Sequence, residues 1–521
     1  MPCAPFRSIP AIAPYALMIG AGLLWSMPAT AAAPHRVDGD SADWLTHSPI
    51  AFDPSGDSND NFDLTTLYAD SEGSTLFLQF DISVERNLPA GANNDGDLII
   101  EIGLPGGDTL NLDLRGRSAS LSNGGSFDWP DIGFTTAPTY AASVFEMQVD
   151  LSSFGVGVGD TVSIAFSGSD SFDGGPVDFT LTDPAPAEVR RSADKDAMTA
   201  FRVASLNTKS NGLLDGGRQA RFARLLDAVD AEVYVFQEEW DDSASGIQSF
   251  IESVDPLDDG ASWSVHKVDG AIIAARGAVT PLNELNNRYA AAIVEPVSGM
   301  PVLIISAHLK CCGYIGSSED NQRIGQAEDI VQTINDLRNA GPGSALEPYK
   351  DAPVIVAGDY NLVGSRTPVT IIENNPIPAM ARWLLGHQIG ESIVTWESPT
   401  SSYWPGTLDM LVHSTDDLER RNGFILDSSE LNGSELAALG LNSSDSQASD
   451  HYMLVTDFAF VTDGPGLPGD LNGDCVVDTA DLGLLLGVFQ TNDNLADLNG
   501  DGTVDTADLG LLLGAFGTTC P

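Results

Sequence analysis

The sequence predicts a multidomain protein in which a β-sandwich, a layered α/β domain and a small helical repeat domain follow one another. Short alternating runs fill the first part, apolar strands alternate with helical stretches in the middle, and a direct repeat occupies the end. These patterns are typical of the three classes. Two linkers rich in Pro, Gly or charge, residues 182–197 and 462–469, separate the domains.

Residues 1–33 have the composition of a secretory signal. A basic residue, Arg7, is followed by the apolar run IPAIAPYALMIGAGLLW and by small residues up to Ala33. This order is typical of a cleaved signal peptide. No later run of about 18 apolar residues follows, so we expect a secreted or extracytoplasmic protein without a transmembrane segment.

The composition is strongly acidic. Lys and Arg total 24 against 74 Asp and Glu, a formal charge of -50. Such a charge repels bulk polyanions unless metal ions or local basic residues intervene, which argues against nonspecific DNA binding. Beyond the signal the cysteines are Cys311, Cys312, Cys475 and Cys520, an even number that suits an oxidising compartment.

The first domain, residues 34–181, carries the strand-like runs TLFLQFDIS, DLIIEIGL, TLNLDLRG and TVSIAFSG, which predict a β-sandwich. Its opening VDGDSADW, Val37 to Trp44, resembles the start of sandwich domains like carbohydrate-binding module family 9. The resemblance implies a glycan or surface ligand. Trp44 and the run from Leu76 to Phe80 are equally compatible with a structural core.

The last domain, residues 470–521, contains a direct repeat. DLNGDCVVDTADLGLLLGVF returns as DLNGDGTVDTADLGLLLGAF. Each copy has oxygen side chains at positions 1, 3, 5, 9 and 12 of a Ca²⁺ loop. These residues are Asp470, Asn472, Asp474, Asp478 and Asp481, then Asp497, Asn499, Asp501, Asp505 and Asp508. Because no Lys or Arg balances these acids, we expect folding to require Ca²⁺.

An Asp at position 12 and the lack of an entering helix make this domain resemble a type I dockerin. The resemblance implies two bound Ca²⁺ ions and a cohesin-like partner domain. Cys475 lies within the first loop and Cys520 near the chain end, and we expect a disulfide between them. Two unpaired thiols are the alternative.

The central domain, residues 198–461, places polar side chains where its strands end. These are Asn207, Glu238, His308, Asp359, Asn361, Asp409, Asp450 and His451. Alone, Asp359 and Asn361 in VIVAGDYN would be ordinary turn residues. Together, carboxylate and amide oxygens suit Mg²⁺, and the histidines can exchange protons with a phosphate. The set indicates metal-assisted phosphoester hydrolysis.

The ordered series SLNT, FQEE, SAHLK, GDYN, LDML and SDHY resembles the endonuclease/exonuclease/phosphatase superfamily over the whole central domain. The resemblance implies a four-layered α/β sandwich and a phosphodiesterase or nuclease that uses Mg²⁺ or Mn²⁺. Asn207 and Glu238 would then lie at the metal site. Asp359 would activate water, and Asn361 would hold a phosphoryl oxygen.

The same resemblance implies that Asp409 bonds His451, whose imidazole faces the phosphate, and that His308 touches the scissile phosphate. Asp450 would contribute to the metal and phosphate environment. Arg276 and Arg288 would face the phosphate, with surface salt bridges as the alternative. A basic residue usual before the Asp of LDML is replaced by Gly406 and Thr407.

Three functions remain open at this point. The first is a phosphodiesterase or endonuclease whose phosphoester substrate includes nucleic acid. The second is a phospholipid or sugar-phosphate hydrolase similar to sphingomyelinases. The third is a non-catalytic binding or scaffold component of a polysaccharide-degrading assembly. The pair Cys311 and Cys312 favours a vicinal or other structural bridge, with a soft-metal site as an alternative.

Overall fold

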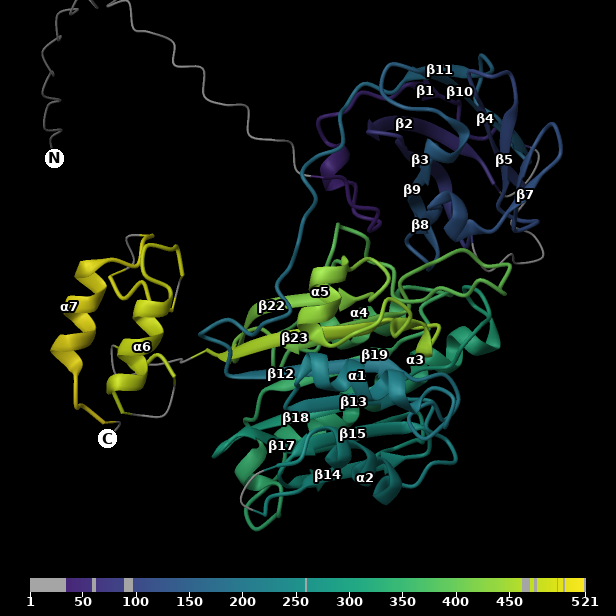
Figure 1. Cartoon of the computed structure of the whole chain (residues 1–521). Helices are drawn as coiled ribbons and strands as arrows, with labels where there is room; N and C mark the ends of the chain where they lie inside the picture. Colours follow the sequence, from purple (N-terminus) through teal and green to yellow (C-terminus); the bar gives the residue numbers. More distant parts are fainter. Residues whose placement is uncertain are drawn as a thin grey trace, which may run out of the picture. The chain divides into compact units, whose positions relative to one another are not determined.

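The computed structural model describes residues 34–58, 62–88, 97–257, 260–461, 469–472, 476–493, 495–499 and 502–519 (Figure 1). Within these ranges, the helices are too short or too polar for a bilayer crossing. Short 3₁₀ turns are η1 (Ser41–Trp44), η2 (Trp129–Ile132), η3 (Ser152–Phe154), η4 (Glu347–Tyr349) and η5 (Ser446–Ala448).

Residues 34–181 form two antiparallel sheets. The first has the order β1 (Ala51–Phe52), β2 (Leu64–Glu72), β3 (Thr75–Arg86), β9 (Ala142–Asp150) and β8 (Thr135–Ala137). The second has the order β11 (Val177–Thr180), β10 (Thr161–Gly168), β4 (Leu98–Gly103), β5 (Thr109–Asp113), β6 (Ser118–Leu121) and β7 (Ser126–Phe127). Alternate residues of β4, β5 and β10 are buried in one core with residues of β2 and β3, as in a sandwich.

Trp44 belongs to the packing of this domain. It is buried with Val37, Phe77 and Ala137, and its indole N–H donates to Glu146 Oε1 at 2.8 Å. The core alternative for Trp44 and for the run Leu76 to Phe80 therefore agrees with their burial.

The central domain is built on two mixed sheets. One has the order β14 (Trp263–Val268), β15 (Ala271–Arg276), β13 (Val233–Gln237), β12 (Phe201–Asn207), β23 (Met453–Phe460) and β22 (Leu418–Leu426). The other has the order β16 (Val279–Pro281), β17 (Tyr289–Val297), β18 (Met300–His308), β19 (Val354–Asp359), β21 (Asp409–Ser414) and β20 (Met380–Trp383).

The two sheets pack face to face, and helices cover their outer faces. Side chains of Val203, Val235, Ile304 and Ile355 share one core between the sheets. The helices are α1 (Gln219–Val229), α2 (Ala244–Val254), α3 (Ser318–Arg338), α4 (Thr367–Glu373) and α5 (Gly433–Leu439). Helices α1 and α2 pack on the outer face of the first sheet, and α3 and α4 on that of the second. Every residue of β12 and β19 is buried, as expected of strands covered on both faces.

The β-sandwich contacts a loop of the central domain. Trp404 is buried in the sandwich core, with its ring centroid 5.6 Å from that of Trp129. Thr139 donates through Oγ1 to the backbone oxygen of Leu362 at 2.8 Å. The loop that carries Trp404 therefore depends on the sandwich for its position.

The last domain contains helices α6 (Thr479–Gly487) and α7 (Thr506–Ala515). Each begins with a capping box. The side chain of Asp478 or Asp505 accepts from a backbone N–H of the first turn, and the side chain of Asp481 or Asp508 accepts from the backbone N–H of that capping residue. The predicted Ca²⁺ ligands Asp474 and Asp501 and the predicted disulfide partners Cys475 and Cys520 lie outside the described residues. Val476 and Thr519 form an isolated antiparallel bridge.

Candidate functional site

Strand register brings three of the polar residues side by side. In the parallel pairing of β18 with β19, His308 lies opposite Asp359, and in the antiparallel pairing of β19 with β21, Asp359 lies opposite Asp409. Gly358 permits this pairing, because a Cβ there would lie 2.0 Å from the backbone oxygen of Ala307.

The other sheet contributes residues from the same end of its strands. Asn207 ends β12, and Glu238 directly follows β13, which runs parallel to β12. Asp450 and His451 precede β23, which is antiparallel to β12, so they also reach that end. Direct contacts join residues of the two sheets, such as Asn207 and Asp359.

Hydrogen bonds organise two carboxylates around an amide. Asn207 Nδ2 donates to Glu238 Oε1 at 3.2 Å and to Asp359 Oδ2 at 3.0 Å. Asp359 also accepts from Asn361, through the backbone N–H to Oδ1 and through Nδ2 to Oδ2, both at 2.8 Å. Glu238 and Asn361 adopt positive φ angles of 68° and 47°, a strain that concentrates at functional sites.

His308 faces both carboxylates. Its Nε2 lies 3.8 Å from Glu238 Oε1 and 3.7 Å from Asp359 Oδ2. Burial and the positive charge of Arg288 hold the pKa of His308 well below its ordinary value. A neutral imidazole is therefore available to interact with a ligand in this site.

Asp409 and His451 form a buried pair, with Asp409 Oδ2 2.7 Å from His451 Nδ1. Burial opposes the charge on the ring, but the negative charge and hydrogen bond of Asp409 outweigh it and raise the pKa of His451 to about 9. The second nitrogen, Nε2, lies 4.0 Å from Asp359 Oδ2. His451 is thus a cation beside the carboxylates at neutral pH.

The carboxylates suit a divalent cation. Burial, with the charge of Asp409, raises the pKa of Asp359 to about 7 against the opposing charge of His451. Glu238 and Asp359 offer hard oxygen ligands of the kind that Mg²⁺ or Mn²⁺ takes. Asn207 Oδ1 accepts from the backbone N–H of Lys209 at 3.0 Å, so in this conformation Asn207 positions the two carboxylates.

These residues border a cavity of about 490 Å³. Glu238, His308, Asp359, Asn361, Asp450 and His451 line it, and we call them, with Asn207 and Asp409, the strand-end cluster. Sequence reasoning missed several other lining residues: Thr139, Lys209, Trp240, Lys310, Tyr314, Trp396, Tyr403 and Trp404. Lys209 and Lys310 each stand two residues after a residue of the cluster, which was an available signal. The aromatic residues carried no comparable signal.

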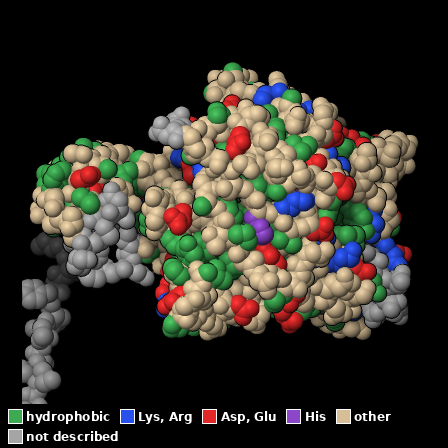
Figure 2. Space-filling model, turned by 90° about the horizontal axis from the view of Figure 1, so that it is seen from below, with side chains coloured by type: hydrophobic (Ala, Val, Ile, Leu, Met, Phe, Trp, Pro, Cys, Tyr) green, Lys and Arg blue, Asp and Glu red, His purple; other side chains and the backbone are tan. Residues whose placement is uncertain are grey.

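Basic side chains line this cavity, although Gly406 and Thr407 replace the basic residue that is usual before Asp409. Lys209 Nζ lies 3.1 Å from Asp450 Oδ2. Arg288 lies over the Trp240 ring at 5.5 Å and donates to the backbone oxygen of Leu309 at 3.0 Å. Lys209, Lys310 and Arg288 can attract an anion into an otherwise acidic protein, whose acidic side chains are spread over the face in Figure 2.

Arg276 does not join the site, which corrects the expectation that it faces a phosphate. Strand β15 runs antiparallel to β13, so Arg276 lies at the opposite end from Glu238. It pairs there with Asp230, with Glu232 at 3.2 Å and with Asp255 at 2.9 Å. The surface-salt-bridge alternative therefore holds for Arg276.

Cys311 and Cys312 lie at the cavity as free thiols, so the structure lacks the bridge favoured from the sequence. Their Sγ atoms are 2.9 Å apart, longer than a disulfide bond of about 2.05 Å. Burial and the Cys311 thiol raise the pKa of Cys312 to about 11.

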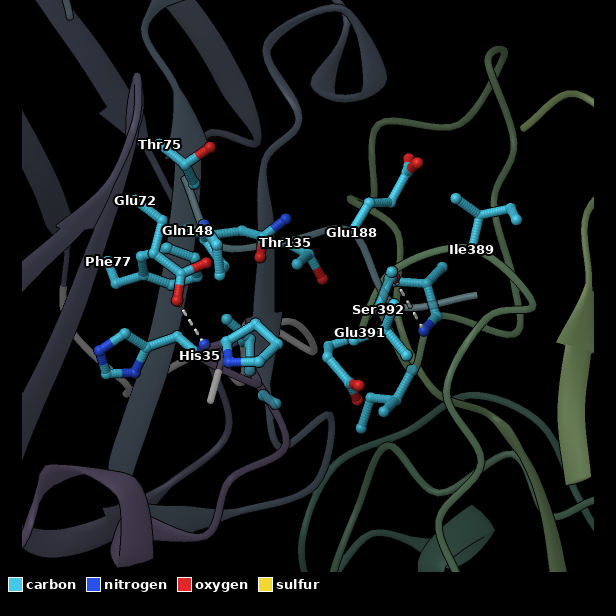
Figure 3. Close-up of a pocket in the computed structure, with 18 of the residues that line it drawn as sticks. His35, Glu72, Thr75, Phe77, Thr135, Gln148, Glu188, Ile389, Glu391 and Ser392 are labelled. Atoms are coloured by element: carbon cyan, nitrogen blue, oxygen red, sulfur yellow. Dashed lines mark hydrogen bonds between the residues drawn. The ribbon is translucent and has the colours of Figure 1, made fainter. Parts of the chain in front are cut away.

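A second cavity, of about 320 Å³, has a different lining. Glu72, Glu188 and Glu391 lie around it, and the backbone N–H of His35 donates to Glu72 Oε1 at 2.6 Å (Figure 3). No residue of the strand-end cluster is among the described residues that line it. Its acidic lining suits a phosphate less well than the larger cavity does.

Neither a protein-family model nor a curated protein sequence matches the chain. Among solved structures, the chain is similar to the human Nocturnin catalytic domain with bound sulfate, at 20% identity over 50% of this chain and 94% of that one, with a TM-score of 0.35. It is similar to D. rerio TDP2 complexed with a single-strand DNA product, at 17% identity over 50% and 98%, with a TM-score of 0.33. It is also similar to ANGEL2, a 2',3'-cyclic phosphatase, at 16% identity over 50% and 94%, with a TM-score of 0.34.

Proposed function

We propose that the central domain is a Mg²⁺- or Mn²⁺-dependent phosphodiesterase or endonuclease of the endonuclease/exonuclease/phosphatase superfamily. The observation that carries the proposal is the convergence of Glu238, His308, Asp359 and His451 on one cavity, from strands far apart in sequence, with Asn207 bonded to both carboxylates. Two acids, two histidines and flanking cations form a set suited to phosphoester hydrolysis.

Glu238 would hold the metal, and Asn207 would keep the carboxylates of Glu238 and Asp359 in place. When bound, the metal would supply charge neutralisation at the phosphate and would favour deprotonation of water. Asp359 would take a proton from the attacking water at Oδ2, where Asn207 and Asn361 fix its orientation.

The histidines would act on the phosphate itself. His451, held as a cation by Asp409, would present Nε2–H to a phosphoryl oxygen. The neutral His308, whose Nε2 lies near both carboxylates, would contact the scissile phosphate. Lys209, Lys310 and Arg288 would draw the anion in.

The test compares the wild type with Glu238→Ala and His451→Ala on DNA and on bis(p-nitrophenyl) phosphate, with and without Mg²⁺. We expect hydrolysis by the wild type with the metal and a loss of about 100-fold or more in each variant. Circular dichroism checks that the variants fold. Undiminished hydrolysis of both substrates by both folded variants would rule out the proposal, and an inert wild type on a broad phosphoester panel would favour the scaffold function.

A second candidate substrate class is a phospholipid or sugar phosphate. Trp240, Trp396, Tyr403 and Trp404 line the cavity, and such aromatic walls suit an apolar or sugar moiety as well as a base. The salt dependence of hydrolysis distinguishes the two substrate classes. A nuclease that contacts several phosphates loses affinity steeply with salt, whereas hydrolysis of sphingomyelin or inositol phosphate should respond weakly.

The flanking domains would place the enzyme. We infer that the protein is secreted, that the dockerin-like domain binds two Ca²⁺ ions and a cohesin-like partner, and that the sandwich binds a glycan or surface. The near-identity of the two repeats would permit two orientations of the bound partner. Pull-down with a panel of cohesin domains, with Ca²⁺ and with chelator, tests this part; binding that is independent of Ca²⁺ or absent across the panel would contradict it.

A further inference from the structure

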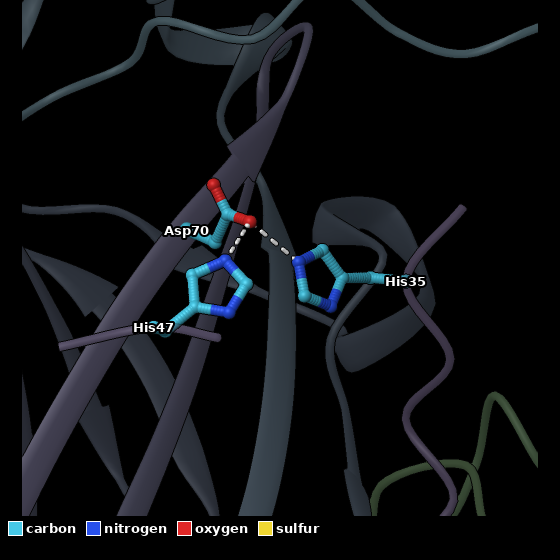
Figure 4. A group of neighbouring side chains, drawn as sticks. All are labelled: His35, His47 and Asp70. Carbon is cyan, nitrogen blue, oxygen red and sulfur yellow. Dashed lines mark hydrogen bonds and ion pairs between the residues drawn. The ribbon is translucent and has the colours of Figure 1, made fainter. Parts of the chain in front are cut away.

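A separate cluster of metal-ligating side chains lies in the β-sandwich. Asp70 on β2 is approached by two imidazoles, with its Oδ2 2.6 Å from His35 Nε2 and 2.8 Å from His47 Nε2 (Figure 4). The ligand atoms of the three residues all lie within 4.8 Å of one another. Both ring nitrogens therefore point to one carboxylate oxygen, and the three groups lie close enough together to share one ion.

A second carboxyl lies beside this centre. Asp183 follows β11, and its backbone oxygen accepts from the N–H of Gly73 at 2.8 Å, which places it at the end of β2. Its side chain is exposed, and it stands outside the group of three residues whose ligand atoms all lie within 4.8 Å of one another. His35, His47 and Asp70 therefore supply three protein ligands, which leaves the fourth position of a tetrahedral site to water.

The surroundings resemble the outer shell of a metal centre. His35 Nδ1 lies 3.4 Å from Asp43 Oδ2, and a metal-bound histidine usually passes its other ring N–H to a carboxylate in this way. The rings of Trp44 and Phe77 each lie 5.0 Å from the His35 ring, centroid to centroid. This packing covers the His35 ring, while the three ligand residues themselves are half-buried.

We propose that His35, His47 and Asp70 bind one Zn²⁺ ion. Imidazole nitrogens suit Zn²⁺, whereas Mg²⁺ and Ca²⁺ take oxygen ligands. The ligands come from the segment before β1 and from β2. The ion therefore has a structural role, because it ties the entry segment of the sandwich to this strand.

Without an ion, the same atoms form a hydrogen-bonded histidine and aspartate network. The two possibilities differ in zinc uptake. The full chain is first freed of metal with chelator, then returned to saturating Ca²⁺ and Mg²⁺, and finally titrated with Zn²⁺ by calorimetry. We expect the wild type to bind one more Zn²⁺ per chain than the double variant His35→Gln, His47→Gln, and to gain a higher unfolding temperature with Zn²⁺ than the variant does.

Two further variants sharpen the test. Asp43→Asn should weaken zinc binding by about 10-fold to 100-fold, as expected for loss of an outer carboxylate. His266→Gln is the matched control, because His266 pairs with Glu284 at 2.7 Å in the central domain and should leave the uptake unchanged. Equal zinc uptake by the wild type and the folded double variant would overturn the proposal.

Should the double variant fail to fold, crystals of the wild type soaked in Zn²⁺ decide the question. Anomalous scattering at the zinc edge should give a peak within bonding distance of His35, His47 and Asp70. A peak only at other positions, such as the two catalytic histidines, would equally overturn it.

Discussion

Oδ2 of Asp409 lies 2.7 Å from Nδ1 of His451, although 42 residues separate them in the chain. The carboxylate both fixes the ring and favours its protonated form. The other ring nitrogen, Nε2, then carries a proton and lies 4.0 Å from Asp359 Oδ2. A buried carboxylate that orients a histidine is a positioning residue, and its loss should change the pH dependence of the reaction as well as its rate.

We expect Asp409→Asn to lower kcat by about 100-fold or more. The negative charge of Asp409 raises the pKa of His451 to about 9, so activity that needs the protonated ring falls as pH rises through that value. Without the charge, this alkaline limb moves to lower pH. Rate profiles from pH 6 to 10 measure both effects. Asp336→Asn, on exposed helix surface, is the control, and an unmoved limb would contradict this role.

Asp359→Asn should reduce turnover by about 100-fold or more, a loss far larger than its effect on stability. The variant retains the size of the side chain but removes a buried charge, whose cost is visible in the pKa of about 7. Steady-state kinetics and thermal unfolding in metal-free buffer measure the two quantities. A large fall in unfolding temperature would instead assign Asp359 a mainly structural role.

Substitutions of Arg288 and Arg276 should have different effects on kinetics and stability. Arg288→Gln should lower kcat/KM, because Arg288 lines the cavity beside Trp240. Arg276→Gln should leave kinetics unchanged and lower the unfolding temperature, because Arg276 pairs with Asp230, Glu232 and Asp255 at the far end of the sheet. Kinetics and thermal unfolding of both variants check this; a kinetic defect in Arg276→Gln alone would reverse the assignment.

His413 should make the central domain sensitive to acid. Burial, with the charge of Arg420, lowers the pKa of His413 to about 4, below the ordinary 6.5. The unfolded chain therefore takes up a proton first as pH falls, so this contribution to stability is present above pH 6.5. It falls by about 1.4 kcal/mol per pH unit down to about pH 4. His413→Gln, which can still donate to the backbone oxygen of Ala381, should reduce that slope in urea unfolding.

Removal of Ca²⁺ should unfold the repeat domain. Asp481 and Asp508 are buried, and each accepts backbone N–H groups of its own loop. Without a cation the remaining acids repel one another. Chelation should therefore remove the part of the helical circular dichroism signal that comes from α6 and α7. Asp481→Ala and Asp508→Ala should mimic one half of that loss each. Helical signal that survives chelation would contradict Ca²⁺-coupled folding.

The sequence by itself determined the elements and the chemistry of the candidate site. Apolar runs predicted strands such as β12 and β19, and the polar residues at their ends marked Asn207, Glu238, His308 and Asp359, because strand burial and turn chemistry are local properties. Only tertiary structure decided which side chains meet. Strand direction carried Arg276 away from Glu238, and the packing of two sheets added Trp240 and Lys310 to the cavity. Likewise, only folding brought His35, His47 and Asp70 together, because register and layer packing join positions that no local pattern relates.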